Sequence, residues 1–394
     1  MKPAYIFGSL GFYDDFTSRF LTLGTEHQSM AARDYYSRGQ NLVYNRPVLV
    51  IFAVIGVFLV FDILRQVGTG TIVITDLMSY LWNGLVLGMS LGLAGVGLSM
   101  TYSILNFANF AHGDLITSGA FAGWATAFLI AGLGEFSVES LILIGGPIAV
   151  GSNELGINVV NTPLALLAGL LVAAVLTAAL SLLLDRIVFK PMRSADGVTL
   201  MIASVGVALF LRNFLTYSFL TDSRGLTGGN VPQFTIAGVT FGGHQITLVV
   251  VAALLMLGTH ILLQYTKIGT AMRAMAANKD LAKVTGIPTE RVVKLTWIIG
   301  GGLTGCAGFL IALQQGTLTV TMGWDLLLLV FAAVILGGVG SIYGAMVGGV
   351  ILGIASRLAL VWIPASFLLV AAFVIMIVML LVRPSGLFSG RTTA

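Results

Sequence analysis

The chain has 394 residues, of which 57% are hydrophobic and only 9% are charged, and its formal net charge is +4. An ordinary soluble domain carries about a quarter charged residues, so this composition excludes a soluble protein and indicates an integral membrane protein. The apolar runs are continuous rather than alternating. This pattern favours an all-α bundle of membrane-spanning helices over a membrane β-barrel.

Residues 1–46 are the only sizeable polar stretch before the first apolar run, and they are expected to form a cytoplasmic amino-terminal extension. The apolar core of a cleavable signal peptide would come much earlier in the chain. Residues 47–76 are therefore interpreted as a retained extra anchor helix, over 48–64, and an outer loop. The main transmembrane domain is expected over 77–388, with a short tail at 389–394.

Ten spans are predicted in this polytopic bundle, each from a long apolar run. They lie at 48–64, 77–100, 115–131, 163–187, 198–220, 247–265, 295–313, 325–336, 342–363 and 366–382. The single cysteine of the chain, Cys306, falls inside one of them, so an intrachain disulfide is excluded.

Basic residues indicate which loops face the cytoplasm, because cytoplasmic loops carry an excess of Lys and Arg. The amino-terminal extension holds five, the turn around Lys190 three, the loop 266–294 six and the tail two. Outside the spans, only Arg65 and Arg224 fall on the other side. Both termini are therefore predicted to be cytoplasmic. The positive net charge follows mostly from this bias and does not indicate nucleic acid binding.

A polar stretch, Asn106-Phe-Ala-Asn-Phe-Ala-His-Gly-Asp114, follows the second span. Polar groups beside a span are costly unless they cap a helix or line a hydrated cavity. One interpretation is that Asp114 caps the next helix while Gly113 lets the chain turn. The other is that Asn106, Asn109, His112 and Asp114 line a path or gate. No metal site is expected, since no second His or Cys lies at ligand spacing from His112.

The loop 266–294 is a basic island between two apolar spans. Each of its six basic residues would cost about 2.5–3.5 kcal/mol at a bilayer centre, so it is predicted to be a cytoplasmic loop. It is expected to contain two short helices, 270–277 and 279–285, which Gly286 and Pro288 then stop. One interpretation is a loop that only determines topology.

The other interpretation of this loop rests on Asp280-Leu281-Ala282-Lys283-Val284-Thr285-Gly286. A short helix with a small apolar face, formed by Leu281, Ala282 and Val284, could pack into the groove of a partner protein. Asp280 and Lys283 would then pair with the rim of that groove.

Glycines are spaced by four in two places, and this spacing puts them on one face of a helix. We predict that they let neighbouring helices approach closely. They are Gly301 and Gly305 in one set, and Gly340, Gly344 and Gly348 in the other. Two arginines, Arg212 and Arg357, also fall within predicted spans. They are expected to pair inside the protein rather than to contact a solute.

Six further segments form an ordered set of motifs. They are Asn109-Phe-Ala-His-Gly-Asp114, Phe189-Lys-Pro-Met-Arg193, Ala203-Ser-Val-Gly-Val-Ala-Leu-Phe-Leu-Arg-Asn213, Arg273-Ala-Met-Ala-Ala-Asn278, Leu336-Gly-Gly-Val-Gly-Ser-Ile-Tyr-Gly-Ala345 and Leu381-Val-Arg-Pro-Ser-Gly-Leu387. In this order they resemble the motifs of the branched-chain amino acid ABC permeases, the LivH-type group, and the resemblance covers about 77–387. The stretch 280–286 also resembles the Glu-Ala-Ala-x-x-x-Gly loop of ABC importer permeases. Asp280 stands where the family has Glu, and Tyr343 where it usually has Pro. The amino-terminal extension with its extra span is a further departure.

The resemblance implies the translocation subunit of a binding-protein-dependent ABC importer for branched-chain amino acids or a similar small polar solute. In that family, ATP is hydrolysed by separate subunits, into which the loop docks as a coupling helix. The implied coupling residues are Asp280, Leu281, Ala282, Lys283 and Gly286. The implied partners are ABC ATPase subunits, a second homologous permease subunit or a second copy of this chain, an extracytoplasmic solute-binding protein and the lipid bilayer. The implied location is the inner (plasma) membrane of a prokaryote, crossed many times.

The alternative is a self-powered carrier or channel, which would need acidic residues deep in several spans. Asp62, Asp185 and Asp325 come close to spans, but all lie near predicted ends. No Lys in the chain is followed by Ser or Thr, so the Gly-Lys-Ser/Thr end of a phosphate-binding loop is absent from the sequence. The chain is therefore not expected to be an enzyme, and no catalytic residue, cofactor or metal is predicted.

Overall fold

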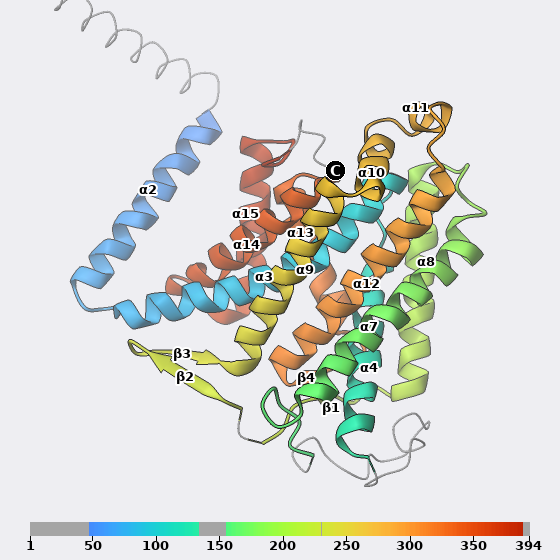
Figure 1. Ribbon diagram of the computed structural model, residues 1–394. Coiled ribbons are helices and arrows are strands. Elements are labelled where there is room, and N and C mark those ends of the chain that lie inside the picture. Colours follow the sequence, from blue (N-terminus) through green and yellow to red (C-terminus); the bar gives the residue numbers. More distant parts are fainter. Residues whose placement is uncertain (1–46, 134–154, 230, 389–394) are drawn as a thin grey trace, which may run out of the picture. The chain divides into compact units, whose positions relative to one another are not determined.

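The computed structural model describes residues 47–133, 155–229 and 231–388 (Figure 1). The predicted extension 1–46 and tail 389–394 lie outside these residues. The chain divides into two units, Met1–Thr69 and Gly70–Ala394. In the first unit, α2 (Pro47–Gly68) includes the predicted anchor helix and has 22 residues. At 1.5 Å per residue this is about 33 Å, enough to cross the hydrocarbon core of a bilayer.

The second unit is a bundle of helices. Its described helices are α3 (Ile74–Leu105), α4 (His112–Ala131), α7 (Pro163–Leu184), which continues as the π-helix η1 (Asp185–Phe189), α8 (Gly197–Phe219), α9 (Gly243–Tyr265), α10 (Lys267–Ala277), α11 (Lys279–Val284), α12 (Thr289–Gln315), α13 (Met322–Gly337), α14 (Ile342–Leu358), the 3-10 turns η2 (Ala359–Val361) and η3 (Ala365–Phe367), and α15 (Leu368–Val382). Among the described residues of this second unit, eight helical segments are long and apolar enough to cross a membrane, and α13 is shorter, at 16 residues. This confirms a polytopic membrane helix bundle.

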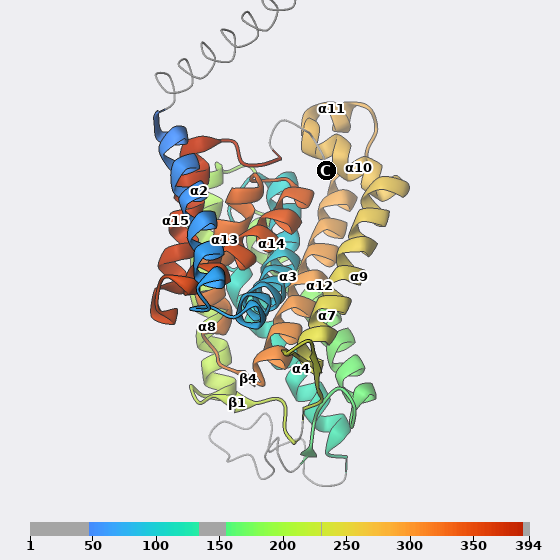
Figure 2. The same cartoon turned by 90° about the vertical axis from the view of Figure 1, so that its left-hand side faces the viewer.

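Two short antiparallel strand pairs lie at one end of the bundle. β1 (Arg224–Gly225) pairs with β4 (Thr317–Leu318), and β2 (Gln233–Ile236) pairs with β3 (Val239–Gly242) in a hairpin with Phe234 opposite Phe241. Figure 2 shows β1 and β4 at the end of the bundle opposite to α10 and α11. The two ends of the membrane domain therefore differ in structure, with the basic loop at one and the strands at the other.

Helix α3 lies in the centre of this bundle and packs against α9, α12, α13 and α14. Every residue in 88–101 is buried, which is expected of a helix that is apolar on all sides and enclosed by protein. By contrast, only Ala371 and Ala372 are buried in α15, although α15 is more apolar than α3. The exposed apolar surface of α15 suits contact with lipid.

Glycines allow α3 and α14 to touch backbone to backbone. A Cβ atom added at Gly349 would lie 2.5 Å from the Cα of Gly92, and one at Gly353 would lie 2.4 Å from the Cα of Gly88. Both separations are far below van der Waals contact, so side chains at these positions would push the helices apart. The sequence analysis did not select these glycines, although Gly84, Gly88 and Gly92 are themselves spaced by four.

The structure places four of the five predicted packing glycines in helix contacts. A Cβ at Gly301 or Gly305 of α12 would lie 2.3 Å from an atom of α7, namely Ser181 Oγ or the Ala173 carbonyl oxygen. Gly344 and Gly348 of α14 meet α13 in the same way, at Gly337 and Ala333. The prediction that Gly340 shares their helix face is wrong. It precedes α14, in a turn where its φ of +82° is the left-handed conformation that glycine adopts freely.

Candidate functional site

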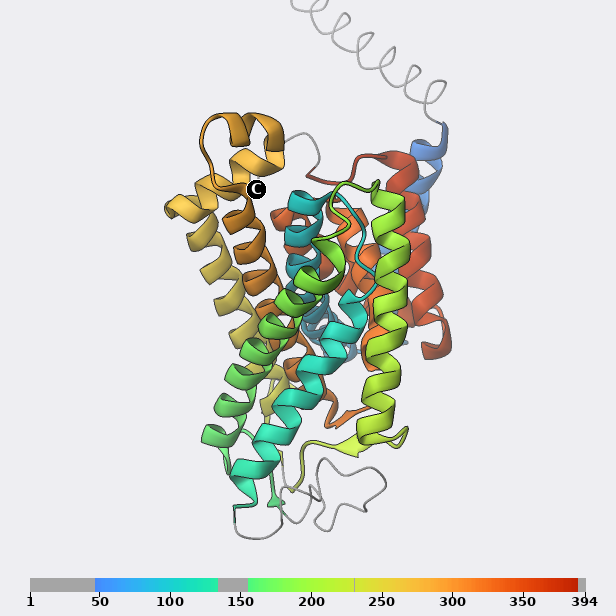
Figure 3. The ribbon, with the colours of Figure 1, turned by 90° about the vertical axis from the view of Figure 1, so that its right-hand side faces the viewer.

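The polar stretch 106–114 forms a break between α3 and α4. Helix α3 ends at Asn106, whose φ of +57° is left-handed, a conformation that Asn tolerates better than most residues. Residues 107–111 are not helical, and α4 begins at His112. Figure 3 shows this connection running beside α8 into the bundle, so that α4 begins inside the bundle rather than at its end.

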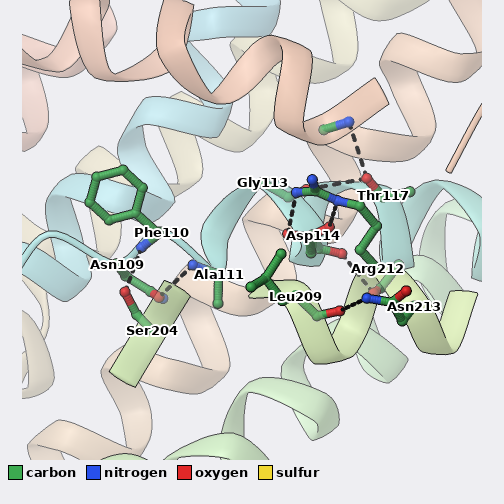
Figure 4. Close-up of polar contacts among 12 residues, drawn as sticks. Asn109, Phe110, Ala111, Gly113, Asp114, Thr117, Ser204, Leu209, Arg212 and Asn213 are labelled. Atoms are coloured by element: carbon green, nitrogen blue, oxygen red, sulfur yellow. Dashed lines mark hydrogen bonds and ion pairs between the residues drawn. The ribbon is translucent and has the colours of Figure 1, made fainter. Parts of the chain in front are cut away.

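A helix that begins inside a membrane bundle needs partners for its first N–H groups, because lipid offers none. The N–H of its first residue, His112, donates to the Asn109 carbonyl oxygen at 3.3 Å, and side chains bond the two N–H groups just before the helix. The Ala111 N–H donates to Asn109 Oδ1 at 3.1 Å, and the Phe110 N–H donates to Ser204 Oγ of α8 at 2.9 Å (Figure 4). Asn109 is buried and Asn106 is exposed. Asn109 therefore stabilises the break from within.

His112 connects the start of α4 to α3. Its side chain is buried, and its Nε2 lies 2.9 Å from the carbonyl oxygen of Ala94. A carbonyl oxygen only accepts hydrogen bonds, so Nε2 carries the proton and donates. In 47–133, 155–229 and 231–388 no three His, Cys, Asp or Glu side chains gather into a possible metal site.

Asp114 forms an ion pair with Arg212 inside the bundle (Figure 4). Arg212 reaches from α8 and donates through Nε to Asp114 Oδ1 at 3.3 Å and through a terminal nitrogen to Oδ2 at 3.2 Å. The Asp114 side chain is fully buried, and the guanidinium of Arg212 lies 4.3 Å from the ring centre of Trp324 on α13. Residues from α4, α8 and α13 thus meet at one buried charge pair. This confirms the expectation that Arg212 pairs internally.

The interpretation of Asp114 as a helix cap is wrong, and so is that of Gly113 as a turn. Ala111 occupies the cap position of α4 and makes no side-chain cap bond, while Asp114 lies in the first turn and points to Arg212. Gly113 is helical and faces α13, where a Cβ added to it would lie 2.8 Å from the Gly323 carbonyl oxygen. The long-range partners therefore decide the roles of both residues.

The first turns of α4 and α13 are in direct contact. The Gly323 N–H donates to Thr117 Oγ1 at 3.1 Å, and a Cβ at Gly323 would lie 1.9 Å from the Gly113 carbonyl oxygen. Two helix amino termini, each with a partial positive charge, therefore lie side by side. Such an arrangement favours negative charge at this point of the bundle.

An apolar cavity lies on the neighbouring side of α4, between α4, α7 and α8. Its volume is about 460 Å³, and its lining includes Ser118, one turn after Asp114, and Leu211, next to Arg212. Most of the other lining side chains are apolar, among them Phe121, Leu176 and Phe214. This lining suits an apolar occupant better than a small polar solute.

The basic loop folds as α10 and α11, and the two predicted short helices are confirmed. Thr266 caps α10 by accepting from the Gly269 N–H at 3.1 Å, and Asn278 caps α11 by accepting from the Leu281 N–H at 2.9 Å. Gly286 has a φ of +85° after α11, in the left-handed conformation that ends helices. The local capping chemistry of the sequence therefore determines both helices.

The predicted apolar face of α11 divides into two parts. Leu281 is 61% exposed and Val284 is 86% exposed, whereas Ala282 is only 4% exposed and belongs to the core cluster that contains Met272 and Met275. The prediction that all three share one docking face is therefore wrong. Ala282 faces inwards because it lies one position after Leu281, about 100° around the helix. Asp280 and Lys283 are exposed.

Charged residues hold the exit of this loop to the end of α7, an arrangement that sequence reasoning missed. Arg193 donates to both oxygens of the buried Asp185 carboxylate, at 2.8 and 2.9 Å, and also bonds Glu290 at the start of α12. Lys190 lies 3.7 Å from Glu290. Burial alone would lower the pKa of Arg193, but its bonds to Asp185 and Glu290 raise it above the ordinary value, so Arg193 stays charged.

These features define a class of protein. It is a polytopic membrane protein with a helix that begins in its interior, a buried charge pair beside that helix and a structured loop at one end. The family model described as branched-chain amino acid transport system / permease component matches residues 80–382, and the chain belongs to this family.

Individual relatives cover most of the chain. LivH, a high-affinity branched-chain amino acid transport system permease protein of Escherichia coli (strain K12), is 29% identical over 319 residues, which cover 79% of this chain and 94% of LivH. BraD of Pseudomonas aeruginosa is 29% identical over 315 residues, 79% of this chain and 95% of BraD. The ribose import permease RbsC of Escherichia coli is 24% identical over 295 residues, 71% and 86% of the two chains. No solved structure matches the chain.

Proposed function

We propose that the chain is the translocation subunit of an ABC importer for branched-chain amino acids or a similar small polar solute, driven by ATP hydrolysis in separate subunits. The family match over residues 80–382 carries this proposal, because that range includes both the helix break and the loop 266–294. The ribose permease among the relatives is the reason why the solute class stays broad.

The alternative, a self-powered carrier or channel, is disfavoured by the partners of the buried acids. Such a transporter needs carboxylates in its spans that can exchange a proton or a cation. Asp114 is paired with Arg212, and Asp185 is paired with Arg193. An acid neutralised by an arginine is a poor site for a coupling ion, so an external source of energy fits better.

We infer a gate at the break between α3 and α4, formed by Asn106, Asn109, His112 and Asp114. The break puts non-helical backbone and the first turn of α4 inside the bundle, which is tolerated where backbone lines a cavity or is enclosed by protein. The buried Asp114–Arg212 pair joins α4 to α8. Separation of these two helices during alternating access would have to open this pair.

For the orientation, we propose ten spans with both termini in the cytoplasm of a prokaryote, in its inner membrane. The domains are those expected from the sequence: an extension at 1–46, an anchor and loop at 47–76, the membrane domain at 77–388 and a tail at 389–394. The loop with α10 and α11 would then be cytoplasmic, and β1 to β4 would face outwards.

Cysteine labelling tests this orientation. Thr285 and Ser223 are both exposed, at opposite ends of the bundle, while the native Cys306 is buried. In cells, an impermeant maleimide should label Ser223→Cys but not Thr285→Cys, and inside-out vesicles should give the reverse. The unsubstituted protein, whose single cysteine is Cys306, gives the background labelling. Labelling of Thr285→Cys from outside would contradict the proposed orientation.

We propose that ABC ATPase subunits dock on α11, with a second permease subunit beside this chain and a solute-binding protein at the outer end. Leu281 and Val284 are exposed apolar side chains of α11, and Figure 2 shows α11 beyond the ends of α9 and α12. An exposed apolar pair on a short capped helix fits insertion into a groove. Asp280 and Lys283 flank the pair, and Gly286 shapes the turn behind it.

The experiment that tests this function combines Leu281→Glu with Val284→Glu. Two charges in an apolar groove lose their hydration without a partner, so the ATPase subunits should no longer co-purify and solute uptake should stop. The membrane domain should stay inserted. Val198→Glu is a matched control, since Val198 is 57% exposed at the start of α8 on the same end of the bundle (Figure 3). Normal ATPase recovery with the double variant would contradict the docking proposal.

Two other substitutions in the loop separate docking from folding. Ala282→Glu places a charge inside the loop's own core, so it should disturb α10 and α11 themselves. Gly286→Asp keeps the surface of α11 but puts a side chain in a left-handed conformation, at a cost of about 1–2 kcal/mol. Both should weaken ATPase binding less selectively than the Leu281 and Val284 changes.

A further inference from the structure

A chain of four polar side chains joins the entry of the loop to the start of α14. Arg273 on α10 donates to Gln264 Oε1 at 2.6 Å. Gln264 on α9 donates through Nε2 to the hydroxyl of Tyr343 at 2.9 Å. The same hydroxyl lies 2.8 Å from Nδ1 of His260, one turn earlier on α9. Tyr343 is the second residue of α14 and lies far from the others in the sequence.

The donors and acceptors of these hydrogen bonds fit one assignment, which runs from Arg273 to His260. Arg273 only donates, so the amide oxygen of Gln264 must face it, and the amide nitrogen must then face Tyr343. Tyr343 therefore accepts from Gln264. Its own O–H is free to donate to His260, whose Nδ1 accepts in the tautomer protonated at Nε2. Each bond in such a chain polarises the next, which makes the chain stronger than separate pairs.

Because Tyr343 lies on α14, these hydrogen bonds connect the loop to the packed core of the bundle. Helix α14 packs through its glycines against α3, the central helix, and against α13, whose first turn meets α4 at the helix break. Helix α10 is the first part of the loop that holds the proposed ATPase-docking helix α11. Through Gln264 of α9, the Tyr343 hydroxyl is thus a polar link between Arg273 of the loop and a helix of the bundle core.

We propose that Tyr343 is a positioning residue that holds α10 to α14 and so sets how tightly ATP hydrolysis is coupled to solute movement. This rests on the proposed importer function. When docked ATPase subunits move the loop, the link makes α14 follow. Without the hydroxyl, α10 keeps its buried Met272 and Met275, so the loop stays folded but moves more independently of α14.

The first test measures how firmly α10 is held in the purified protein without its partners. Tyr343→Phe keeps the ring and removes the hydroxyl. Backbone hydrogen–deuterium exchange in α10 should become about two- to tenfold faster, the range that corresponds to losing the Gln264–Tyr343 bond, which is the bond on the path to α10. Exchange in α7 should not change. Tyr217→Phe is the matched control, because Tyr217 is an exposed residue on α8. Unchanged exchange in α10 would overturn the positioning role, whatever the protein transports.

The second test measures ATP hydrolysed per solute molecule taken up, in the importer assembled with its ATPase subunits and solute-binding protein. Tyr343→Phe should raise this ratio, again about two- to tenfold for loss of the Gln264–Tyr343 bond, with full recovery of ATPase subunits. Gln264→Leu should raise it too, and the double variant should be no worse than the worse single variant, since both act in one chain. A wild-type ratio, or a change explained by lost subunits, would overturn the coupling role.

The two tests also separate this inference from the proposed function. If the wild-type assembly shows no ATP-driven uptake, the importer function is wrong and the coupling role falls with it. The exchange result on the isolated chain still decides whether Tyr343 positions α10. Faster exchange together with a wild-type ratio would leave a structural link and overturn the coupling proposal.

Discussion

Gly305→Ala is expected to prevent normal folding of the membrane domain. A Cβ at this position would lie 2.3 Å from the Ala173 carbonyl oxygen and 2.5 Å from Thr177 Oγ1, and Gly119 of α4 already lies against the Gly305 backbone. Overpacking a tight core typically costs about 1–3 kcal/mol, and occasionally more. Here rigid backbone stands on both sides of the glycine, so we expect the upper end of that range.

The measurement for Gly305→Ala is the yield of monodisperse protein and its thermal unfolding in detergent. Gly302→Ala is the matched control on the same helix, because a Cβ there would meet only the Ala174 carbonyl oxygen, at 3.6 Å, which is ordinary contact. Its alanine should be neutral or slightly stabilising, since alanine favours a helix by about 1 kcal/mol over glycine. Equal stability of the two variants would mean that α12 can move away from α7 at little cost.

Arg212→Leu should destabilise the protein and stop uptake. It leaves the fully buried Asp114 carboxylate without its partner, and breaking a buried pair in this way typically costs about 3–5 kcal/mol. Arg186→Leu removes the same charge from an exposed position in η1 and should change stability by less than about 0.5 kcal/mol. Thermal unfolding of the purified variants measures the difference.

Asp114→Leu combined with Arg212→Leu separates a structural role of the pair from a role in the gate. Replacing a buried pair by apolar residues is often neutral or stabilising, so the double variant should recover most of the lost stability. If the pair opens and closes during transport, uptake should stay low even though the protein is folded and still binds its ATPase subunits. Recovery of both stability and uptake would show that the pair only holds α4 to α8, and the proposed gate would be wrong.

Features that depend on short stretches of sequence could be predicted from the sequence. The spans follow from the transfer of apolar side chains into lipid, which is a property of about twenty consecutive residues. The helices α10 and α11 follow from local capping by Thr266 and Asn278, and the left-handed conformation of Gly286 follows from its lack of a side chain. The order of short motifs was likewise enough to indicate the family that residues 80–382 match.

Features that depend on contacts between distant residues were decided by the tertiary structure. Asp114 and Arg212 are 98 residues apart, and nothing in the local pattern distinguishes a helix cap from a partner on another helix. The same limit applies to Ala282, which is buried because the loop folds over it, and to Gly340, which lies in the turn before α14 rather than on its face. Every one of these outcomes depends on which helices become neighbours. In a bundle where almost all side chains are apolar, close packing of helix surfaces selects those neighbours, and hydrophobicity alone does not.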